Sequence, residues 1–344
     1  MRTPVPRHTV GPTQTVRRLL IAVALLVGAV SAPSTASASA PHAGLATPHL
    51  LVSGLAGGSG STIGPDGALY IPENAAGRIA RVDRRTGAVS VFASGLPPLN
   101  PAVGIGGVMD VAFLKGRAYA LVTLVGTDTG GSNTVGIYRI DSPTTSSVVA
   151  DIGAFALANP PEPAFFVPTG VQYAMQPYRG GFLVSDGHHN RVLRVTLDGQ
   201  ISVFRAFDNI VPTGLALRGR TVYMAEAGPV PHAPADGKVV SFGPRSSAPK
   251  LVASGAPLLV DVEFGPGRTL YALAQGDYSG DPEGSPALPD TGTLVRAKGK
   301  SLVKVAEGLD RPTSMEIVGR TAYVVTLTGE IWTIRLASGH HHHH

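Results

Sequence analysis

The segment PTGLALRGRTVY (residues 212–223) recurs later in the chain as PTSMEIVGRTAY (residues 312–323). Both copies begin with a proline, continue with apolar residues at alternating positions, turn at a glycine and end in an apolar run that contains a tyrosine. Alternation with a period of two is typical of a β-strand, and a glycine between two such runs favours a tight antiparallel hairpin. The repeated unit is therefore predicted to be a β-hairpin.

Other segments follow the same pattern, which makes the hairpin an internal repeat. They are Ile63–Tyr70, Val108–Tyr119, Pro168–Val184 and Val260–Tyr271. Two more strand-like runs follow each hairpin, so that four short strands recur with a period of roughly 45–55 residues, as in propeller blades. The pattern predicts an all-β fold, a six-bladed β-propeller with one blade for each repeat. A parallel solenoid, the alternative, needs shorter and more regular repeats.

The two ends of the repeat array are predicted to pair with each other. The last copy begins at Pro312, supplies three strands and ends near Leu336. The early segment 49–53 resembles the fourth strand of the other repeats, such as the run 250–254. We therefore expect the N-terminal strand to close the last blade, which removes free edges from the ring. The propeller is predicted to span residues 46–338.

Residues 1–40 are predicted to be a signal peptide and linker. Two arginines at 17–18 precede an apolar run over residues 19–30 that is too short to span a bilayer comfortably, and a stretch of small residues follows. Cleavage after Ala38 is expected rather than after Ala40, because a cut after Ala40 leaves a proline beside it. The alternative is an uncleaved membrane anchor.

Composition narrows the classes of partner and the compartment. The net charge is +5, but four of the 28 basic residues lie in residues 1–40, so that 24 basic residues face 23 acidic ones in the rest of the chain. This balance argues against nucleic acid as a partner. The absence of cysteine excludes disulfides and thiolate metal sites. Residues 339–344 form a His-rich tail that resembles a purification tag. We expect a secreted protein, extracellular or periplasmic, that does not stay at the membrane after signal cleavage.

Four segments give the chain a resemblance to the ScyD/ScyE family. They are SGL (53–55), GPDGALY (64–70), GRI (77–79) and GVMDV (107–111). The resemblance covers about residues 46–337 and implies an exported β-propeller whose molecular activity is not assigned. The segment DGHHNRV (186–192) resembles an NHL-type blade, and the chain has a weaker similarity to SMP-30/gluconolactonase-like propellers. The early Glu-Gly-Pro segment typical of the latter group is missing from this sequence.

Long loops on one face of the predicted ring indicate where a ligand binds. If the strands of a blade are lettered a to d from the axis outward, the b–c connections are long at residues 125–134, 227–236 and 276–290, and the d–a connection is long at 152–167. Loops that are elaborated on one rim are typical of a binding face. The polar residues of this rim are the candidate ligand-binding residues Glu73, Asn74, Asp186, His188, Asn190, Glu226 and His232. The alternative interpretation is that each of these side chains lies in solvent on a surface loop and binds no ligand.

An alignment of the innermost strands points to the axis of the ring. The residues at the equivalent position are Gly60, Asp110, Gly170, Gly214, Asp261 and Ser314. Because the two acids fall in repeats two and five, Asp110 and Asp261 are predicted to face each other across the tunnel mouth. There they would bind a divalent cation such as calcium, or one would hold a proton with a raised pKa. The alternative is that each carboxylate accepts backbone N–H groups of adjacent inner strands.

These features favour a propeller that binds a small molecule or a protein partner on the face with the long b–c and d–a loops. The alternative is a metal-dependent hydrolase or lactonase whose tunnel-mouth metal is held by Asp110 and Asp261. The sequence holds no phosphate-binding glycine loop, zinc-protease helix motif or nucleophile elbow. It assigns no catalytic residue.

Export of the whole chain from a bacterial host is expected to yield a mature form that begins at Ser39, because the residues at 36 and 38 are small and precede the cut. N-terminal sequencing of the exported protein measures this directly. A chain that keeps its first residues and stays with the membrane fraction would support the anchor instead.

Overall fold

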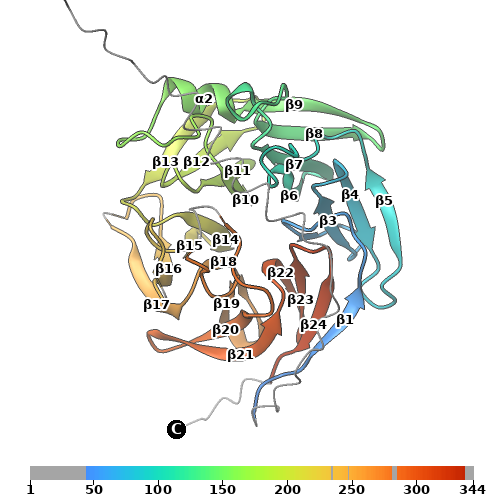
Figure 1. Cartoon of the computed structure of the whole chain (residues 1–344), viewed down its shortest axis with the longest axis vertical. Coiled ribbons are helices and arrows are strands. Elements are labelled where there is room, and N and C mark those ends of the chain that lie inside the picture. Colours follow the sequence, from blue (N-terminus) through green and yellow to red (C-terminus); the bar gives the residue numbers. More distant parts are fainter. Residues whose placement is uncertain (1–43, 234, 247, 281–284, 338–344) are drawn as a thin grey trace, which may run out of the picture.

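Five β-sheets surround a central axis in the computed structural model, which describes residues 44–233, 235–246, 248–280 and 285–337 (Figure 1). The predicted signal peptide and linker (1–40) and the His-rich tail lie outside the described residues. The fold is an all-β, propeller-like one. Within the described part of the chain, no helix is long and apolar enough to cross a membrane.

Four of the sheets have four strands each. The first contains β2 (Thr62–Ile63), β3 (Leu69–Glu73), β4 (Arg78–Val82) and β5 (Val89–Ala93). The second contains β6 (Gly107–Leu114), β7 (Arg117–Thr123), β8 (Gly136–Ser142) and β9 (Thr145–Asp151). The third contains β10 (Gln172–Tyr178), β11 (Gly181–Asp186), β12 (Arg191–Thr196) and β13 (Ile201–Ala206). In each of these sheets, strands that are consecutive in the chain are antiparallel neighbours.

The fourth four-stranded sheet joins the two ends of the described chain. It contains β22 (Pro312–Val318), β23 (Thr321–Thr326), β24 (Ile331–Arg335) and β1 (Pro48–Val52). β1 pairs antiparallel with β24, with Leu50 opposite Trp332 and Val52 opposite Ile331. The predicted closure by the N-terminal strand is confirmed.

The prediction of six separate blades is wrong. The remaining strands form one eight-stranded sheet from β14 (Pro212–Arg218), β15 (Thr221–Glu226), β16 (Gly237–Phe242), β17 (Lys250–Ala256), β18 (Leu259–Phe264), β19 (Leu270–Ala274), β20 (Gly292–Lys298) and β21 (Ser301–Leu309). Two runs of four strands meet in this sheet because β17 and β21 pair in parallel at Ser254 and Ser301, where the Ser254 N–H donates to the Lys300 carbonyl at 3.0 Å. The contact joins two outer strands. The repeated motif covers only the inner hairpin of each repeat, so the sequence pattern could not predict this contact.

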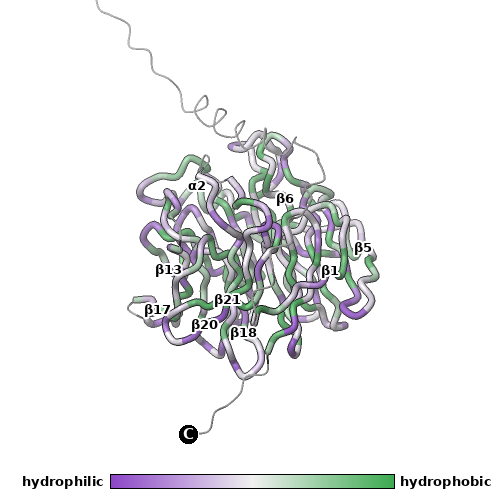
Figure 2. The backbone as a smooth tube through the Cα atoms, turned by 60° about the horizontal axis from the view of Figure 1, so that its bottom comes forward, coloured by the Kyte–Doolittle hydropathy of each residue, from purple (hydrophilic) through white to green (hydrophobic). Residues whose placement is uncertain are grey.

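Among the described residues, helical structure is confined to the connections between strands. The helix α2 (Ile152–Ala158) follows β9, and its N-terminus is capped by the Asp151 carboxylate, which accepts the Ala154 N–H at 2.7 Å. Short 3-10 turns are found at Thr127–Thr129 and Pro266–Arg268. In Figure 2 the apolar stretches run through the strands, whereas many hydrophilic stretches lie at the outer turns.

The repeated tyrosine explains how neighbouring strand groups pack. Tyr70 on β3 meets Phe113 on β6 with ring centroids 4.8 Å apart in an edge-on geometry. Tyr119 on β7 contacts Phe182 on β11 in the same way at 5.0 Å. Edge-to-face pairs of this kind add stability beyond the buried area. In these two repeats, and in the fourth where Tyr223 meets Phe264 at 4.8 Å, the tyrosine links its own strands to those of the next repeat.

Candidate functional site

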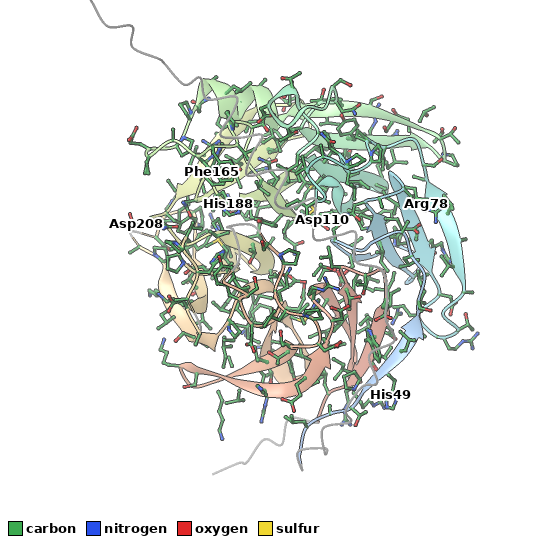
Figure 3. The ribbon with its side chains drawn as sticks, in the orientation of Figure 1. His49, Arg78, Asp110, Phe165, His188 and Asp208 are labelled. Atoms are coloured by element: carbon green, nitrogen blue, oxygen red, sulfur yellow. The ribbon has the colours of Figure 1, made fainter. Side chains whose placement is uncertain are left out.

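Asp110 and Asp261 lie on the innermost strands β6 and β18. Both line one narrow channel along the axis, with a volume of about 60 Å³, and we call it the axial channel (Figure 3 labels Asp110). The two acids thus line the same channel, while the expectation that they face each other across its mouth stays a prediction. The second part of that expectation, a bound cation, depends on what else the carboxylates contact.

Each of the two carboxylates is bonded to backbone. The Oδ1 atom of Asp110 accepts the N–H of Val111 at 2.8 Å, and its Oδ2 atom accepts the N–H of Met175 on β10 at 2.7 Å. Asp261 repeats the arrangement with Val262 at 2.8 Å and with Met315 on β22 at 2.7 Å. These are the bonds of the alternative interpretation, in which each aspartate fastens its strand to the next inner strand.

A metal site built on these aspartates finds no support in this geometry. In the described ranges, no group of three or more His, Asp or Glu side chains is placed to hold a metal ion. A calcium ion takes six to eight oxygen ligands as a rule, whereas these carboxylate oxygens already accept N–H groups. The residues present therefore do not fit a tunnel-mouth calcium.

The alignment of the inner strands was wrong in the third repeat. The N–H of Met175 binds Asp110 as the N–H of Met315 binds Asp261. Because Met315 follows the aligned Ser314, the residue aligned in the third repeat is Ala174, two residues after the Gln172–Asp186 pair. Gly170 precedes β10 and lies against Asp186 instead. The long connection after α2 delays the start of the strand, so that matching the Pro-Thr-Gly motif shifted the register by four residues.

Glycines at the aligned position in two other repeats do border the aspartates. A Cβ atom on Gly60 would collide with Asp110, and one on Gly214 would collide with Asp261. The missing side chain lets the neighbouring inner strand approach closely. Small residues at the axis and bridging carboxylates are therefore two parts of the same packing arrangement.

Two acids of the channel, Glu263 and Glu316, were missed in the sequence. They lie two residues beyond Asp261 and Ser314, and a strand returns to the same face every second residue. All four acids line the axial channel, and no Lys, Arg or His is among its described lining residues. The strand period of two could have identified them, because the residue two positions after an axis-facing residue faces the axis as well.

Enclosure without a counter-charge raises the pKa of the channel acids. Burial raises the pKa of Asp110 to about 8 and that of Asp261 to about 7, although the backbone N–H groups act in the opposite direction. Burial also raises the pKa of Glu263 and of Glu316, and the neighbouring carboxylates raise both further. The axial channel therefore retains protons near neutral pH.

Two of the seven rim candidates are held in ion pairs. Glu73 ends β3 and binds Arg78 through both carboxylate oxygens, at 2.6 and 2.8 Å. Although burial acts to raise it, the pKa of Glu73 is lowered by Arg78 and by the N–H of Ala56. Asp186 ends β11 and accepts from Arg191 at 2.7 Å while it is fully buried. These acids lock the strand ends and are not directed at a ligand.

Asn190 and Glu226 were predicted to bind a ligand from the rim loops, but their side chains have structural surroundings of their own. Asn190 adopts a left-handed conformation with φ of 50°, and its Oδ1 atom accepts the N–H groups of Ile210 and Val211, both at 2.9 Å. Glu226 is 4% exposed and lies opposite Lys238 in the strand register. Burial raises the pKa of Glu226 to about 7, and Lys238 acts in the opposite direction.

The other rim candidates, Asn74, His188 and His232, meet at one cavity. This cavity, the axial pocket, has a volume of about 150 Å³ and is lined by residues at the starts of inner strands and just beyond the ends of second strands. It therefore lies on the face of the long b–c and d–a loops. Its lining residues are Ser59, Asn74, Ile105, Gly106, Met109, Tyr173, His188, Val211, Thr213, Ala227, His232, Leu258, Val260, Gln275, Ser285, Pro286, Thr313 and Leu327.

Aromatic contacts place the two histidines in the wall of the axial pocket. The His188 ring stacks on Phe165 with centroids 4.7 Å apart and an interplanar angle of 3° (Figure 3). Its Nε2 atom is 3.1 Å from the hydroxyl of Tyr173. His232 meets the edge of Tyr278 at 5.7 Å. Phe165 and Tyr173 were not singled out in the sequence, because neither belongs to a repeated position.

Comparisons with known proteins identify the fold alone. No protein-family model matches the chain, and no curated protein matches it. Solved structures that are similar include virginiamycin B lyase from Staphylococcus aureus, with 14% identity over 85% of this chain and 99% of that one and a TM-score of 0.51. A gluconolactonase from Xanthomonas campestris has 13% identity over 85% and 90%, with a TM-score of 0.57. The soluble aldose sugar dehydrogenase of Escherichia coli has 14% identity over 84% and 99%, with a TM-score of 0.55.

All three are β-propeller proteins, and at this level of identity they support a propeller-like fold and nothing finer. The ScyD/ScyE family is not among the matches described, and membership in it stays a prediction.

The channel acids predict that stability falls as the pH rises. A carboxyl group whose pKa is raised by folding stabilises the folded state fully below its ordinary pKa of about 4 and loses this contribution as the pH passes its folded value. The free energy of unfolding in urea is therefore expected to decrease steadily from about pH 5 and to level off above the folded pKa values of about 7 and 8. The double variant Glu263→Gln/Glu316→Gln is expected to lose less over this range, by about 1.4 kcal/mol or more, the equivalent of one pKa unit.

Glu307→Gln on the outer strand β21 is the matched control, since its carboxylate pairs with Lys304 at the surface. Its profile is expected to run parallel to that of the unchanged protein. If the double variant and the control have the same pH dependence, the channel carboxyls do not hold their protons in the folded state.

Proposed function

We propose that this chain is an exported, propeller-like protein that binds a small molecule in the axial pocket. The observation that carries the proposal is the pocket itself, in which apolar walls and a few convergent polar side chains enclose a volume of about 150 Å³ at the end of the axis. Pockets of this composition are the usual sites of small ligands.

The walls of the pocket favour a ligand with an apolar, compact body. Ile105, Met109 and Leu258 supply aliphatic surface, and the rings of His188 and Tyr173 supply flat surface. Gln275 contributes an amide whose Oε1 atom accepts the N–H of Ala287 at 3.0 Å, which fixes the side chain. Such a lining selects ligands by shape and by a small number of hydrogen bonds.

A metal-dependent lactonase is not the function that this geometry supports. That alternative needs Asp110 and Asp261 as metal ligands, and both bridge backbone N–H groups. The similarity to a gluconolactonase is too remote to transfer its activity. The axial pocket, which is separate from those carboxylates, needs no metal to bind a small molecule.

Export and the ScyD/ScyE resemblance belong to the same proposal. The signal-like segment supports export, and a cavity on the loop-rich face suits a protein that meets its ligand outside the cytoplasm. A protein partner on the same face would be recognised through the loops around the pocket rather than through the pocket.

Filling the axial pocket is expected to abolish binding of a small aromatic probe. Met109 is half-buried in the lining, and the indole of Met109→Trp would occupy the space next to it. We expect 2-naphthol, measured by isothermal titration calorimetry, to bind the unchanged protein and to lose at least about tenfold in affinity, or about 1.4 kcal/mol, in the variant.

The control is Val91→Trp, which adds the same side chain at the outer strand β5, where Val91 is 55% exposed. This variant is expected to bind the probe as the unchanged protein does. Equal loss in both variants, or binding that Met109→Trp leaves intact, would rule out the axial pocket as the site.

A further inference from the structure

A second cavity opens beside the axial pocket. This lateral cavity has a volume of about 670 Å³ and lies between the loop 159–165 and the segment 206–211. It shares His188 and Val211 with the lining of the axial pocket. The axial channel also adjoins the axial pocket, with Ser59, Tyr173, Val260 and Thr313 in both linings, whereas the 520 Å³ cavity near Phe113 has no lining residue in common with it.

His188 forms the wall between the two cavities. On one side its ring stacks on Phe165, a residue of the lateral cavity. On the other side it contacts the hydroxyl of Tyr173 at 3.1 Å, and Tyr173 lines the axial pocket. A molecule that occupies both cavities must therefore pass along the His188 ring.

The lateral cavity has an unbalanced negative charge. Glu162 and Asp208 line it and are exposed. The cation of the lining, Arg191, is 4% exposed and is already bound, because it donates to Asp186 at 2.7 Å and to the Asn159 carbonyl at 2.6 Å. A basic group of a ligand is the complement that this charge distribution favours.

The floor of the lateral cavity is fixed. Asn209 donates from Nδ2 to the Val230 carbonyl at 2.6 Å and accepts the Val230 N–H at 3.0 Å. The two N–H groups that bind Asn190 hold the same segment from the other side. Because the segment is bonded at both ends, the cavity is preformed, and a ligand group does not need to order it.

We infer that the lateral cavity is a second subsite for the ligand of the axial pocket, and that this ligand is an elongated aromatic amine. Its planar apolar body occupies the axial pocket, its linker passes the His188 ring, and its protonated amine lies near Glu162 and Asp208. The inference rests on the proposed function, because it takes the axial pocket as the primary site.

The experiment uses 2-naphthol and a series of 2-naphthyloxy-alkylamines whose chains run from ethyl to octyl. Affinity measured by calorimetry is expected to rise to an optimum chain length, where it exceeds that of 2-naphthol by about tenfold. The acetylated form of the best amine, which has no charge, is expected to lose this gain.

The double variant Glu162→Gln/Asp208→Asn tests the position of the amine. It is expected to remove the gain of the best amine and to leave the affinity for 2-naphthol unchanged. The control Glu307→Gln/Asp198→Asn makes the same charge change at acids outside both linings and is expected to keep the gain.

The outcomes separate the two proposals. If 2-naphthol binds in the axial pocket but the chain brings no gain, or brings a gain that both double variants keep or both reduce equally, the second subsite is refuted and the axial pocket stands. If neither 2-naphthol nor the amines bind, or if Met109→Trp leaves their binding intact, the proposed function fails and this inference fails with it.

Discussion

The packing of inner strands around the axis is the constraint on which the rest of the structure depends. Strands that converge on an axis leave little room for side chains. In two places a glycine on one inner strand therefore packs directly against an aspartate on the next inner strand. Asp110 and Asp261 each reach across to a backbone N–H of the following inner strand, at Met175 and Met315. These hydrogen bonds give acceptors to backbone N–H groups at a junction that no regular strand pairing covers.

This constraint also determines where space is left for the proposed ligand. The axial channel is narrow and is lined by four carboxyl groups. The larger space for a small molecule is the axial pocket, on the face of the long loops. Glu73 and Asp186 do not compete for a ligand there, because Arg78 and Arg191 hold them at the ends of their strands. The rim side chains that do meet the cavity are carried by loops, and their positions depend on those locked strand ends.

The sequence predicted the strands well because the hairpin repeats and because alternation with a period of two reports one buried face. It also predicted the pairing of residues 48–52 with β24, since both segments had the features of strands that lacked a partner. The number of separate sheets was wrong, because the parallel contact between Ser254 and Ser301 involves outer strands with no shared motif.

The site was harder to predict because the role of a side chain depends on strand register and on loops that follow no repeated pattern. Glu73 was chosen as a ligand-binding residue, yet its partner Arg78 faces it only through strand register. Gly170 was aligned by its motif, whereas the long connection before the inner strand places Ala174 at the aligned position. His188 was identified as a rim residue, but its contact with Phe165 comes from a loop of no regular pattern.

Amide hydrogen exchange at Met175 and Met315, followed by NMR, tests the role of the axial aspartates most directly. Both N–H groups are predicted to exchange as slowly as those in the centres of the strands. Asp110→Asn is predicted to speed exchange at Met175 far more than at Met315, and Asp261→Asn to do the reverse. Fast exchange at both sites in the unchanged protein, or a stoichiometric divalent ion that is lost in both variants, would contradict the account.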